Sequence, residues 1–505
     1  MATLDDVLFG DVILCSGQVR GHRAALSDRV VSVCLLETLG LTQPALYRRC
    51  LQSNMNFAVN QMTGAHAEIV LANRPRFQSI RLFTAKPTYD SKGPHDDLTV
   101  LQNWSIANSL TVGGGWNGSV SNASFSYFSA ACWVQGRHLF DRLGGKVPLG
   151  LLTSAVGGTR VHCWSSPDAL KTCPQYLPPG QANNRTAARA RGDSDLWNTM
   201  VYPLLPMRFK FMVWLQSESD VCAHDDECAP QRGALYYTCQ IKAMVKDWRE
   251  KFDLALPFLW VQISPWEGHE AATTAHQLPD MRLAQMAAND LPQSGMATAV
   301  DLGPAANAHG WDSGDEHGPD PWGNVHFRNK GPLGPRLSSA ALHIVYGNTT
   351  EPYRGPEAAT VSLVALPTSS GCTGARATGV SISFKPETLG AGLKWIPKEC
   401  PYLVLKNEAH MQTEIDCPRS IDDCIKKCAW FDLELGKDNW SQNVTAALSE
   451  DRESIVLSPP TDAAGCHLAG VVPTGARYLY GDWPVATLFN EDGFPALPFK
   501  LTVGK

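Results

Sequence analysis

Short, continuous apolar runs alternate with segments of helical period over residues 8–345, and this alternation constrains the fold more than any other feature. Residues 128–143 and 234–252 have the spacing of amphipathic helices. The apolar runs, each typical of a buried strand, are 10–17, 78–85, 147–155, 209–216, 257–264 and 295–303. Apolar strands separated by amphipathic helices indicate a parallel sheet that is covered on both faces. The sequence therefore predicts an α/β fold with a doubly wound parallel sheet.

The pattern changes after Gly347. Strand-like pieces punctuated by Gly, Pro and Cys follow, with few helical stretches: 360–366, 378–386, 402–407, 454–460 and 476–481. Such short strands with frequent turn residues are typical of an all-β module. We therefore predict an α/β domain over residues 1–347 and a smaller C-terminal all-β domain over residues 348–505.

The charge balance excludes two classes of partner. The chain has 43 Lys and Arg against 49 Asp and Glu, a net charge of -6, without a long basic run. This gives no electrostatic footprint for nucleic acid or for an anionic membrane. The longest apolar stretches, such as 254–263, are shorter than the roughly 20 residues of a spanning helix. We expect no membrane span, and the oligomeric state stays open.

Cysteines and glycosylation sequons point to the secretory route. Fifteen cysteines favour disulfides and an oxidising compartment. We expect Cys15 to be buried in its strand outside any pair, and twelve of the other cysteines to pair in an order that the sequence does not fix. Seven Asn-x-Ser/Thr sequons support the same route: Asn103, Asn117, Asn122, Asn184, Asn348, Asn439 and Asn443.

The first residues, MATLDDVLFGDVILC, lack the features of a signal peptide. We expect the export signal to lie ahead of the printed chain. The predicted location is secreted, or the lysosomal or endomembrane lumen.

Residues that follow the predicted strands are the candidates for chemistry, because ligands bind at the carboxyl ends of parallel strands. Gly157 and Gly158 follow the third run, Gln216 ends the fourth and Glu218 comes after it, and His326 lies in the last α/β segment. A serine hydrolase needs a nucleophile, a base, a carboxylate that orients the base, and donors for the oxyanion. No serine nucleophile follows the first run, although the other parts have candidates.

The missing serine is found further along the chain. Residues 52–57 read QSNMNF, and joining Gln18 directly to Ser53 gives GDVILCSGQSNM. This string resembles the first block of the sialate O-acetylesterase family, within the SGNH hydrolases, where the serine of GQSNM is the nucleophile. The resemblance continues in order through ACWVQGRHLFDRL, GLLTSAVGGTRVHCWSS, SDLWNTMVYPLL, WLQSESD, VKDWREKF, VHFRNK and ARYLYGDWPVATLFNEDGFPALPF. Members of the family have an N-terminal β region before this strand, and we expect that region to be missing here.

Residues 19–52 interrupt the resemblance. They begin with Val and end with Gln, as the translation of a phase-zero intron starting GT and ending CAG would. We interpret them as a retained intron or a gene-model error; the alternative is a genuine lineage-specific loop. If they are translated, we expect activity to fall sharply, because small displacements of a catalytic group cost orders of magnitude in rate.

The resemblance implies a role for each candidate. Ser53 would be the nucleophile and His326 the base, with Glu218 as the orienting carboxylate and Asp320 in reserve. His326 as a structurally satisfied histidine and Glu218 as a solvated turn residue are the alternatives. The backbone N–H of Ser53, an N–H at Gly157 or Gly158, and the Gln216 amide would stabilise the oxyanion. No metal or cofactor is required.

Three further features have competing interpretations. Trp164 either stacks on a sugar ring or is a buried structural tryptophan. Ser194, in the GDSDL string at 192–196, imitates a nucleophile motif but does not follow a strand, so we expect it to be structural. The string CAHDDEC at 222–228 favours paired or solvated cysteines over a metal site.

The predicted function is a carbohydrate O-acetylesterase acting on an O-acetylated sugar or glycan. An acetyl-xylan type of carbohydrate acetylesterase is one alternative. The other is a catalytically impaired glycan-binding protein, because Ser217 stands where the family has Gly, Phe327 stands where it usually has Pro, and the first block is split.

Overall fold

The structure is a computed structural model that falls into two compact units. The first unit is Met1–Ser264, Ala284–Pro304 and Gly310–Glu351, and the second is Pro265–Leu283, Ala305–His309 and Pro352–Lys505. The residues that the structure describes are 9–17, 54–114, 128–173, 192–221, 233–265, 277–303, 326–367, 377–395, 430–441, 444–461, 466–467, 470–481, 484 and 486–504.

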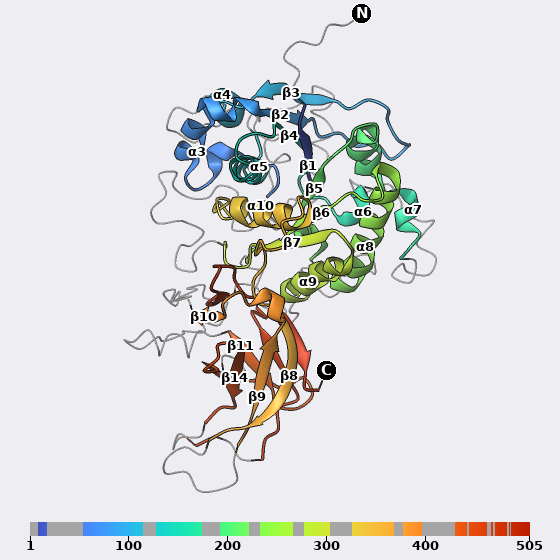
Figure 1. Ribbon diagram of the computed structural model, residues 1–505. Helices are drawn as coiled ribbons and strands as arrows, with labels where there is room; N and C mark the ends of the chain where they lie inside the picture. The colour runs from blue at the N-terminus through green and yellow to red at the C-terminus, as the bar shows by residue number, and fades with distance from the viewer. Residues whose placement is uncertain are drawn as a thin grey trace, which may run out of the picture. The chain divides into compact units, whose positions relative to one another are not determined.

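A seven-stranded sheet forms the centre of the first unit, in the order β3-β2-β4-β1-β5-β6-β7 (Figure 1). Its strands are β1 (Asp11–Gly17), β2 (Ile80–Ala85), β3 (Val100–Ile106), β4 (Leu149–Ala155), β5 (Phe211–Leu215), β6 (Phe258–Gln262) and β7 (Ser294–Thr298). Every neighbouring pair is parallel except β2 and β3, which are antiparallel. The predicted parallel α/β sheet is confirmed, with the antiparallel edge strand β3 as an addition.

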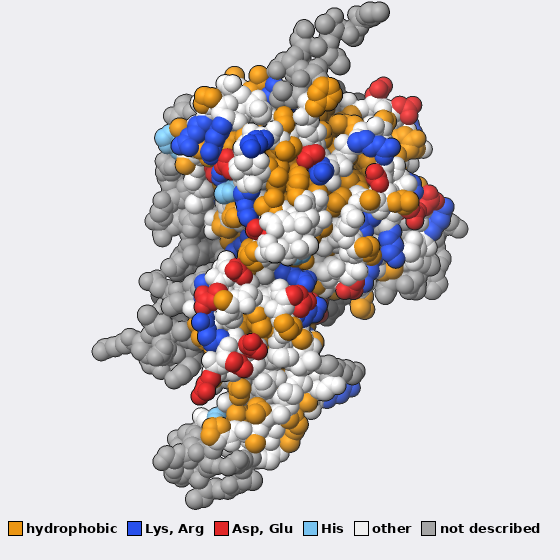
Figure 2. Space-filling view, in the orientation of Figure 1, with side chains coloured by type: hydrophobic (Ala, Val, Ile, Leu, Met, Phe, Trp, Pro, Cys, Tyr) orange, Lys and Arg blue, Asp and Glu red, His pale blue; other side chains and the backbone are white. Residues whose placement is uncertain are grey.

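The edge strand β3 has no continuous apolar run, because much of it faces solvent. Val100, Trp104 and Ile106 are 43%, 43% and 40% exposed. Figure 2 shows hydrophobic side chains interspersed with charged ones on the face of the first unit turned to the viewer. Trp104 still packs on Phe83 of β2, with ring centroids 5.3 Å apart. Tertiary packing of one aromatic ring, rather than a buried run, therefore helps to hold this strand on the sheet.

Helices cover both faces of the sheet. Figure 1 shows α5 (Ala130–Arg142) and α10 (Leu333–Ile344) on one side, and α6 (Val161–Trp164) and α8 (Gly233–Phe252) on the other. The remaining helices are α3 (Ala65–Ala72), α4 (Ser109–Gly113), α7 (Pro167–Leu170) and α9 (Gln277–Met286). The short helical turns of this region are η1 (Val59–Gln61), η2 (Pro75–Ser79), η5 (Trp197–Val201), η6 (Tyr202–Leu204), η7 (Glu218–Asp220) and η8 (Ala287–Asp290).

An aromatic cluster packs β5 and β6 against α6 and α8. Trp214 lies edge-on to Trp164 and to Trp248, with ring centroids 5.7 Å apart in both pairs. Trp248 also packs on Phe258 at 6.2 Å. Burying a large apolar side chain of this kind stabilises a fold by about 1.5–3 kcal/mol. The cluster therefore gives the strand that precedes Gln216 a rigid base.

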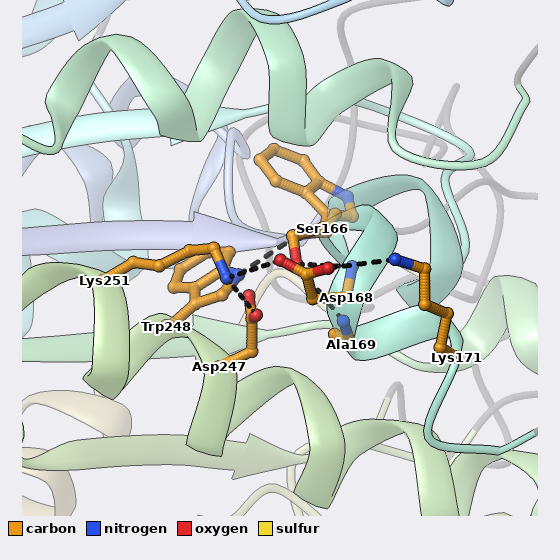
Figure 3. Close-up of polar contacts among 8 residues, drawn as sticks. Ser166, Asp168, Ala169, Lys171, Asp247, Trp248 and Lys251 are labelled. Atoms are coloured by element: carbon orange, nitrogen blue, oxygen red, sulfur yellow. Dashed lines mark hydrogen bonds and ion pairs between the residues drawn. The ribbon is translucent and has the colours of Figure 1, made fainter.

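Polar contacts fasten α7 to α8 at the surface (Figure 3). Ser166 caps α7 by accepting from the backbone N–H groups of Asp168 and Ala169. The Asp168 carboxylate accepts from Lys171 Nζ at 3.2 Å and from Lys251 Nζ at 3.4 Å. Lys251 also donates to Asp247 of the same helix. Exposed ion pairs contribute about 0.2–1 kcal/mol each, so this group supports the packing only modestly.

Two disulfides lie in the described part of the first unit. Cys15 of β1 pairs with Cys132 of α5, and Cys173 pairs with Cys239 of α8. The expectation that Cys15 stays outside any pair is wrong, because the first turn of α5 lies against β1 with the two Cα atoms 5.9 Å apart. The bond ties together residues that are 117 positions apart.

The strand order reverses at the carboxyl ends of β1 and β4. From β1 the chain continues to β2 on one side, whereas from β4 it continues to β5 on the other side of β1. Ligands bind where the strand order reverses in sheets of this class. Gly17 lies opposite Ala155 at this point, and both end their strands.

Antiparallel sheets make up the described strands of the second unit. One sheet has the order β13-β14-β9-β8, another β12-β11-β15-β17, and a third pairs β10 with β16. The strands are β8 (Ala358–Ala365), β9 (Thr378–Phe384), β10 (Leu393–Trp395), β11 (Phe431–Glu434), β12 (Trp440–Ser441), β13 (Thr445–Leu448), β14 (Ser454–Ser458), β15 (Gly475–Tyr478), β16 (Leu488–Asn490) and β17 (Phe499–Thr502), with the helical turn η9 (Pro386–Thr388). The predicted all-β character of this region is confirmed, and the predicted strand 402–407 lies outside the described residues.

Candidate active site

Strand β1 ends in a glycine that no other residue could replace without strain. Gly17 has φ +100°, a conformation that favours glycine. A Cβ atom added there would lie 2.6 Å from the backbone oxygen of Leu215 and 3.1 Å from Gln216 Cβ. The ends of β1 and β5 therefore approach each other closely at the predicted site.

The residues directly after Ser53 are fixed at this end of the sheet. Asn54 Nδ2 donates to Glu218 Oε1 at 2.8 Å, and Asn54 Oδ1 accepts from Lys330 Nζ at 2.6 Å. Asn56 Nδ2 donates to the backbone oxygen of Ala155, the last residue of β4, at 2.7 Å. Both asparagines are buried. Ser53 itself, together with the segment 19–52, lies outside the described residues, so its predicted role stays a prediction.

Glu218 lies in the helical turn η7, directly after β5 and Gln216. The residue is 6% exposed, so the solvated-turn interpretation does not describe it. Burial raises the pKa of Glu218 to about 7; the hydrogen bond from Asn54 and the charge of Lys330 oppose this rise, and Asp220 adds to it. Its second oxygen, Oε2, has no partner among the described residues. Glu218 is thus a carboxylate poised to change charge near neutral pH.

The Gln216 side-chain amide donates both of its hydrogens to other groups of the protein. Its Nε2 donates to the backbone oxygen of Thr159 at 3.0 Å and to Asp220 Oδ2 at 2.5 Å. Asp220 Oδ2 also accepts from the backbone N–H of Val161 at 3.1 Å. Since both amide hydrogens are directed at protein acceptors, we correct the prediction that Gln216 donates to an oxyanion. Its role here is to tie the turn after β5 to the turn after β4.

Sequence reasoning missed Asp220, although it stands four residues after Gln216 within the quoted WLQSESD string. The side chain is fully buried, and burial raises its pKa. A carboxylate in a turn is usually exposed, so only its contact with Gln216 identifies it as part of this network.

Ser217, between these residues, is held in a strained conformation. Its φ is 148°, in the region that favours glycine, and it is fully buried. Its hydroxyl has no hydrogen-bond partner among the residues that the structure describes. Non-glycine residues in such conformations cost about 1–3 kcal/mol and cluster at functional sites. The site therefore stores strain at the position where the family is expected to have glycine.

The segment that contains His326 lies beside the segment that follows Ser53. Arg328 Nε donates to the Gln61 backbone oxygen at 3.0 Å, and the Thr63 N–H donates to the Arg328 oxygen at the same distance. His326 is buried, at 4% exposure. Asp320, the reserve carboxylate, lies outside the described residues.

The glycines after β4 stand at the reversal of strand order, whereas Trp164 does not reach the surface. Gly158 has φ +67°, and Gly157 and Gly158 follow Ala155, the strand end that faces Gly17, with one residue between. Trp164 has no exposed surface, and its Nε1 donates to Thr159 Oγ1 at 2.9 Å. We therefore assign Trp164 to the core and drop it as a sugar-stacking residue.

Two further strings from the sequence and two absences among the described residues complete the description. Ser194 is buried with φ 65°, and its N–H donates to the backbone oxygen of His162 at 3.2 Å. The string 222–228 is outside the described residues. Within the described ranges, no group of three or more His, Cys, Asp or Glu side chains could hold a metal ion. Over those same ranges, no helix has the length and apolarity to cross a membrane.

The structure thus brings three predicted blocks together through one side chain. Asn54, next to Ser53 in sequence, contacts both Glu218 and Lys330, and Lys330 stands four residues after His326. Neither Asn54 nor Lys330 was singled out from the sequence. The only signal for them was their position inside the quoted GQSNM and VHFRNK blocks.

Comparisons with known proteins identify relatives. No protein-family model matches the chain. Sialate O-acetylesterases of Pongo abelii and of Homo sapiens are each 30% identical to it over 374 residues, which are 71% of this chain. Those residues are 58% of each relative, so the chain spans less than two thirds of the length of the curated relatives that it matches.

Among solved structures, a carbohydrate acetylesterase from Xanthomonas citri is similar in fold. The TM-score is 0.62 with 21% sequence identity, and the match covers 97% of this chain and 80% of that one. At this identity, the likeness supports the fold of the chain and says nothing about its substrate.

Proposed function

The chain is a homologue of the sialate O-acetylesterases, and from this premise we propose that it is a carbohydrate O-acetylesterase. It would hydrolyse acetyl esters on sugars through an acetyl-serine intermediate. The observation that carries the proposal is the contact of Asn54 with Glu218 at 2.8 Å, since Asn54 directly follows the proposed nucleophile. This supports a position for Ser53 near a buried carboxylate at the carboxyl ends of β1, β4 and β5.

The proposed reaction has two steps. In the first, Ser53 Oγ attacks the acetyl carbonyl while His326 accepts the serine proton; the ester bond breaks, and His326 returns the proton to the sugar alkoxide. In the second, His326 deprotonates a water that attacks the acetyl-serine; the acyl–Oγ bond breaks, His326 returns the proton to Ser53 Oγ, and acetate is released. Glu218 orients His326 and stabilises its positive charge.

The developing oxyanion needs donors other than Gln216. The backbone N–H of Ser53 and an N–H at Gly157 or Gly158 are the remaining candidates. Gly158 suits this role because its positive φ lets the backbone turn at the end of β4 without a side chain in the way.

The substrate class is an O-acetylated sugar or glycan. The names of the relatives favour O-acetylated sialic acid, and an acetylated wall-type polysaccharide is the alternative. A secreted or lumenal location agrees with the two disulfides of the first unit.

The test is acetate release from a panel of O-acetylated glycans and from 4-nitrophenyl acetate, with and without residues 19–52. We expect Ser53→Ala to reduce turnover by about 10³-fold or more. Ser194→Ala is the matched control and should retain wild-type turnover, because Ser194 lies outside the proposed machinery. Negligible turnover by every version, together with retained glycan binding, would favour the impaired glycan-binding protein instead.

A further inference from the structure

A lysine ammonium is buried against Asn54, the residue that directly follows the proposed nucleophile in sequence. Lys330 has no exposed surface, and its Nζ donates to Asn54 Oδ1 at 2.6 Å. The same nitrogen lies 3.2 Å from the centroid of the Phe327 ring and 5.2 Å from that of Phe57. Lysine is almost never fully buried without a partner, because desolvation of its charge is costly. A side chain that only filled this space would be apolar.

The Asn54 side-chain amide forms hydrogen bonds with two oppositely charged groups. Its N–H group faces the Glu218 carboxylate, and its carbonyl oxygen faces the Lys330 ammonium. If the amide nitrogen and oxygen exchanged places, the N–H group would face the Lys330 ammonium and the oxygen would face the Glu218 carboxylate. Both of these contacts are repulsive. The pair of charges therefore fixes one orientation of the amide, and bonds to charged groups are about twice as strong as neutral ones.

Fixing Asn54 anchors the residue that directly follows Ser53 in sequence. Asn54 is fully buried, and Asn56, two residues on, is held by the end of β4. A misplacement of about 1 Å in a catalytic group costs roughly 10²-fold in rate. An anchor on the residue next to the nucleophile is thus placed to control the geometry of the reaction.

We propose that Lys330 is a positioning residue of this site, which orients Ser53 through Asn54 and holds Glu218 in its charged form. This inference rests on the proposed esterase function. Lys330 touches neither the acetyl group nor the sugar in this proposal. Its positive charge acts on the carboxylate through the bridging amide.

Charge balance around Glu218 supports the second half of the proposal. Burial raises the pKa of Glu218 to about 7, and Lys330 acts against that rise. Asp220 and the neutral Tyr237 also interact with Glu218, and in the proposed mechanism His326 faces it as well. Since Asp220 raises the pKa of Glu218, loss of the Lys330 charge should raise that pKa further.

Lys330→Met tests the inference, because it removes the charge and keeps an unbranched apolar chain. We expect kcat to fall by about 10²-fold with KM within about threefold. The acidic limb of the kcat profile should also move up by about one pH unit or more, since an opposite charge nearby shifts a carboxyl pKa by 1–3 units. The rate at which a fluorophosphonate labels Ser53 should fall in parallel with kcat. Thermal unfolding and circular dichroism report whether the fold is retained.

Lys330→Gln separates the hydrogen bond from the charge. Its amide can still donate to Asn54, so we expect a smaller loss of kcat than for Lys330→Met but the same shift of the acidic limb. Lys251→Met is the matched control: it removes a partly buried lysine that bonds Asp168 and Asp247 away from the site (Figure 3). It should lower stability slightly and leave kcat and the pH profile unchanged.

The outcomes distinguish the inference from the function on which it rests. An active wild-type enzyme whose Lys330→Met and Lys330→Gln variants keep its kcat and pH profile contradicts the inference alone. Failure of both variants to fold also contradicts it, because Lys330 would then serve the fold and not the site. A wild-type protein without esterase activity or labelling at Ser53 contradicts the proposed function first, and the inference with it.

Discussion

Asn54 and Glu218, 164 positions apart in the chain, are joined by a buried hydrogen bond of 2.8 Å. This bond links the residue after the proposed nucleophile to the turn after β5. Burial raises the pKa of its carboxylate partner to about 7, which makes the effects of that group measurable by titration.

The buried Glu218 should make stability depend on pH. Its pKa of about 7 in the folded protein lies above the ordinary value of 4.5. The folded protein therefore holds the proton more tightly than the unfolded chain, so the associated stability is complete below about pH 4.5 and is lost as pH rises through 7. The loss should be about 3 kcal/mol. Urea unfolding between pH 4.5 and 8 measures it.

The matched variant for this titration is Glu218→Gln, which cannot ionise and should lose the part of this slope that Glu218 contributes. The raised pKa of Asp220 leaves a slope of the same sign in both proteins. Equal pH dependence of the wild type and the variant would show that Glu218 is not the source.

Ser217→Gly should stabilise the protein. The change relieves a φ of 148° and removes a buried hydroxyl without a described partner, and these gains outweigh the 0.5–1 kcal/mol entropy cost of glycine. We expect a gain of about 1 kcal/mol in the free energy of unfolding, measured in urea. Ser16→Gly is the control: its hydroxyl also has no described partner, but it lies inside β1, so it should destabilise. A loss of stability in Ser217→Gly would refute the strain at this turn.

Gly17→Ala should damage both fold and activity. The new methyl group would meet the Leu215 backbone oxygen at 2.6 Å, with φ at +100°. We expect a loss of about 3 kcal/mol or more, because neither backbone can move without breaking the β1–β5 pairing. Gly93→Ala, where an added Cβ meets nothing within 4 Å, should be neutral in the same thermal unfolding assay. Wild-type stability in Gly17→Ala would mean that the two strand ends are further apart than described here.

The Cys15–Cys132 disulfide should matter to the site as well as to stability. Removing both cysteines should cost about 3 kcal/mol, as for disulfides that close long loops. Activity should also fall, because Ser129, which caps α5 and bonds the Cys132 N–H, also donates to the Met55 backbone oxygen.

The double variant of Cys173 and Cys239 is the matched control for this prediction. It should lose similar stability but keep its turnover per folded molecule. Peptide mapping under non-reducing conditions checks both pairings directly, and a free thiol at Cys15 would contradict the first.

The sequence predicted the strands that are buried on both faces and missed the one that is not. The apolar runs of β1, β4, β5 and β6 mark them as strands because no face of these strands meets water. β3 has exposed apolar residues separated by polar ones, and its place depends on pairing with β2. Edge strands of this kind depend on tertiary contacts that a single sequence does not encode locally.

The positions of several candidate site residues could be predicted from the sequence, but the hydrogen bonds between their side chains could not. Glu218 is a candidate from its position after a buried strand, and its predicted role as the orienting carboxylate comes from the resemblance of QSE to the family's Gln-Gly-Glu turn. The role of Gln216 was wrong, because a side-chain amide at a strand end fits an oxyanion as well as a neighbouring carboxylate, and only the fold brings Asp220 to it. Lys330 could not be found, since a lysine in a loop is normally exposed and nothing local marks it as buried.

The anchoring of residues 54–58 bears on which insertions this fold can accept during evolution. The groups that hold them, in Glu218, Ala155, Ser129 and Lys330, all come later in the chain. Each doubling of the connecting segment between Gly17 and Asn54 adds only about 0.6 kcal/mol of closure entropy. Extra residues between Gly17 and Asn54 therefore cost little free energy of unfolding. The same segment adjoins the proposed active site, where displacement of a catalytic group would cost most in rate.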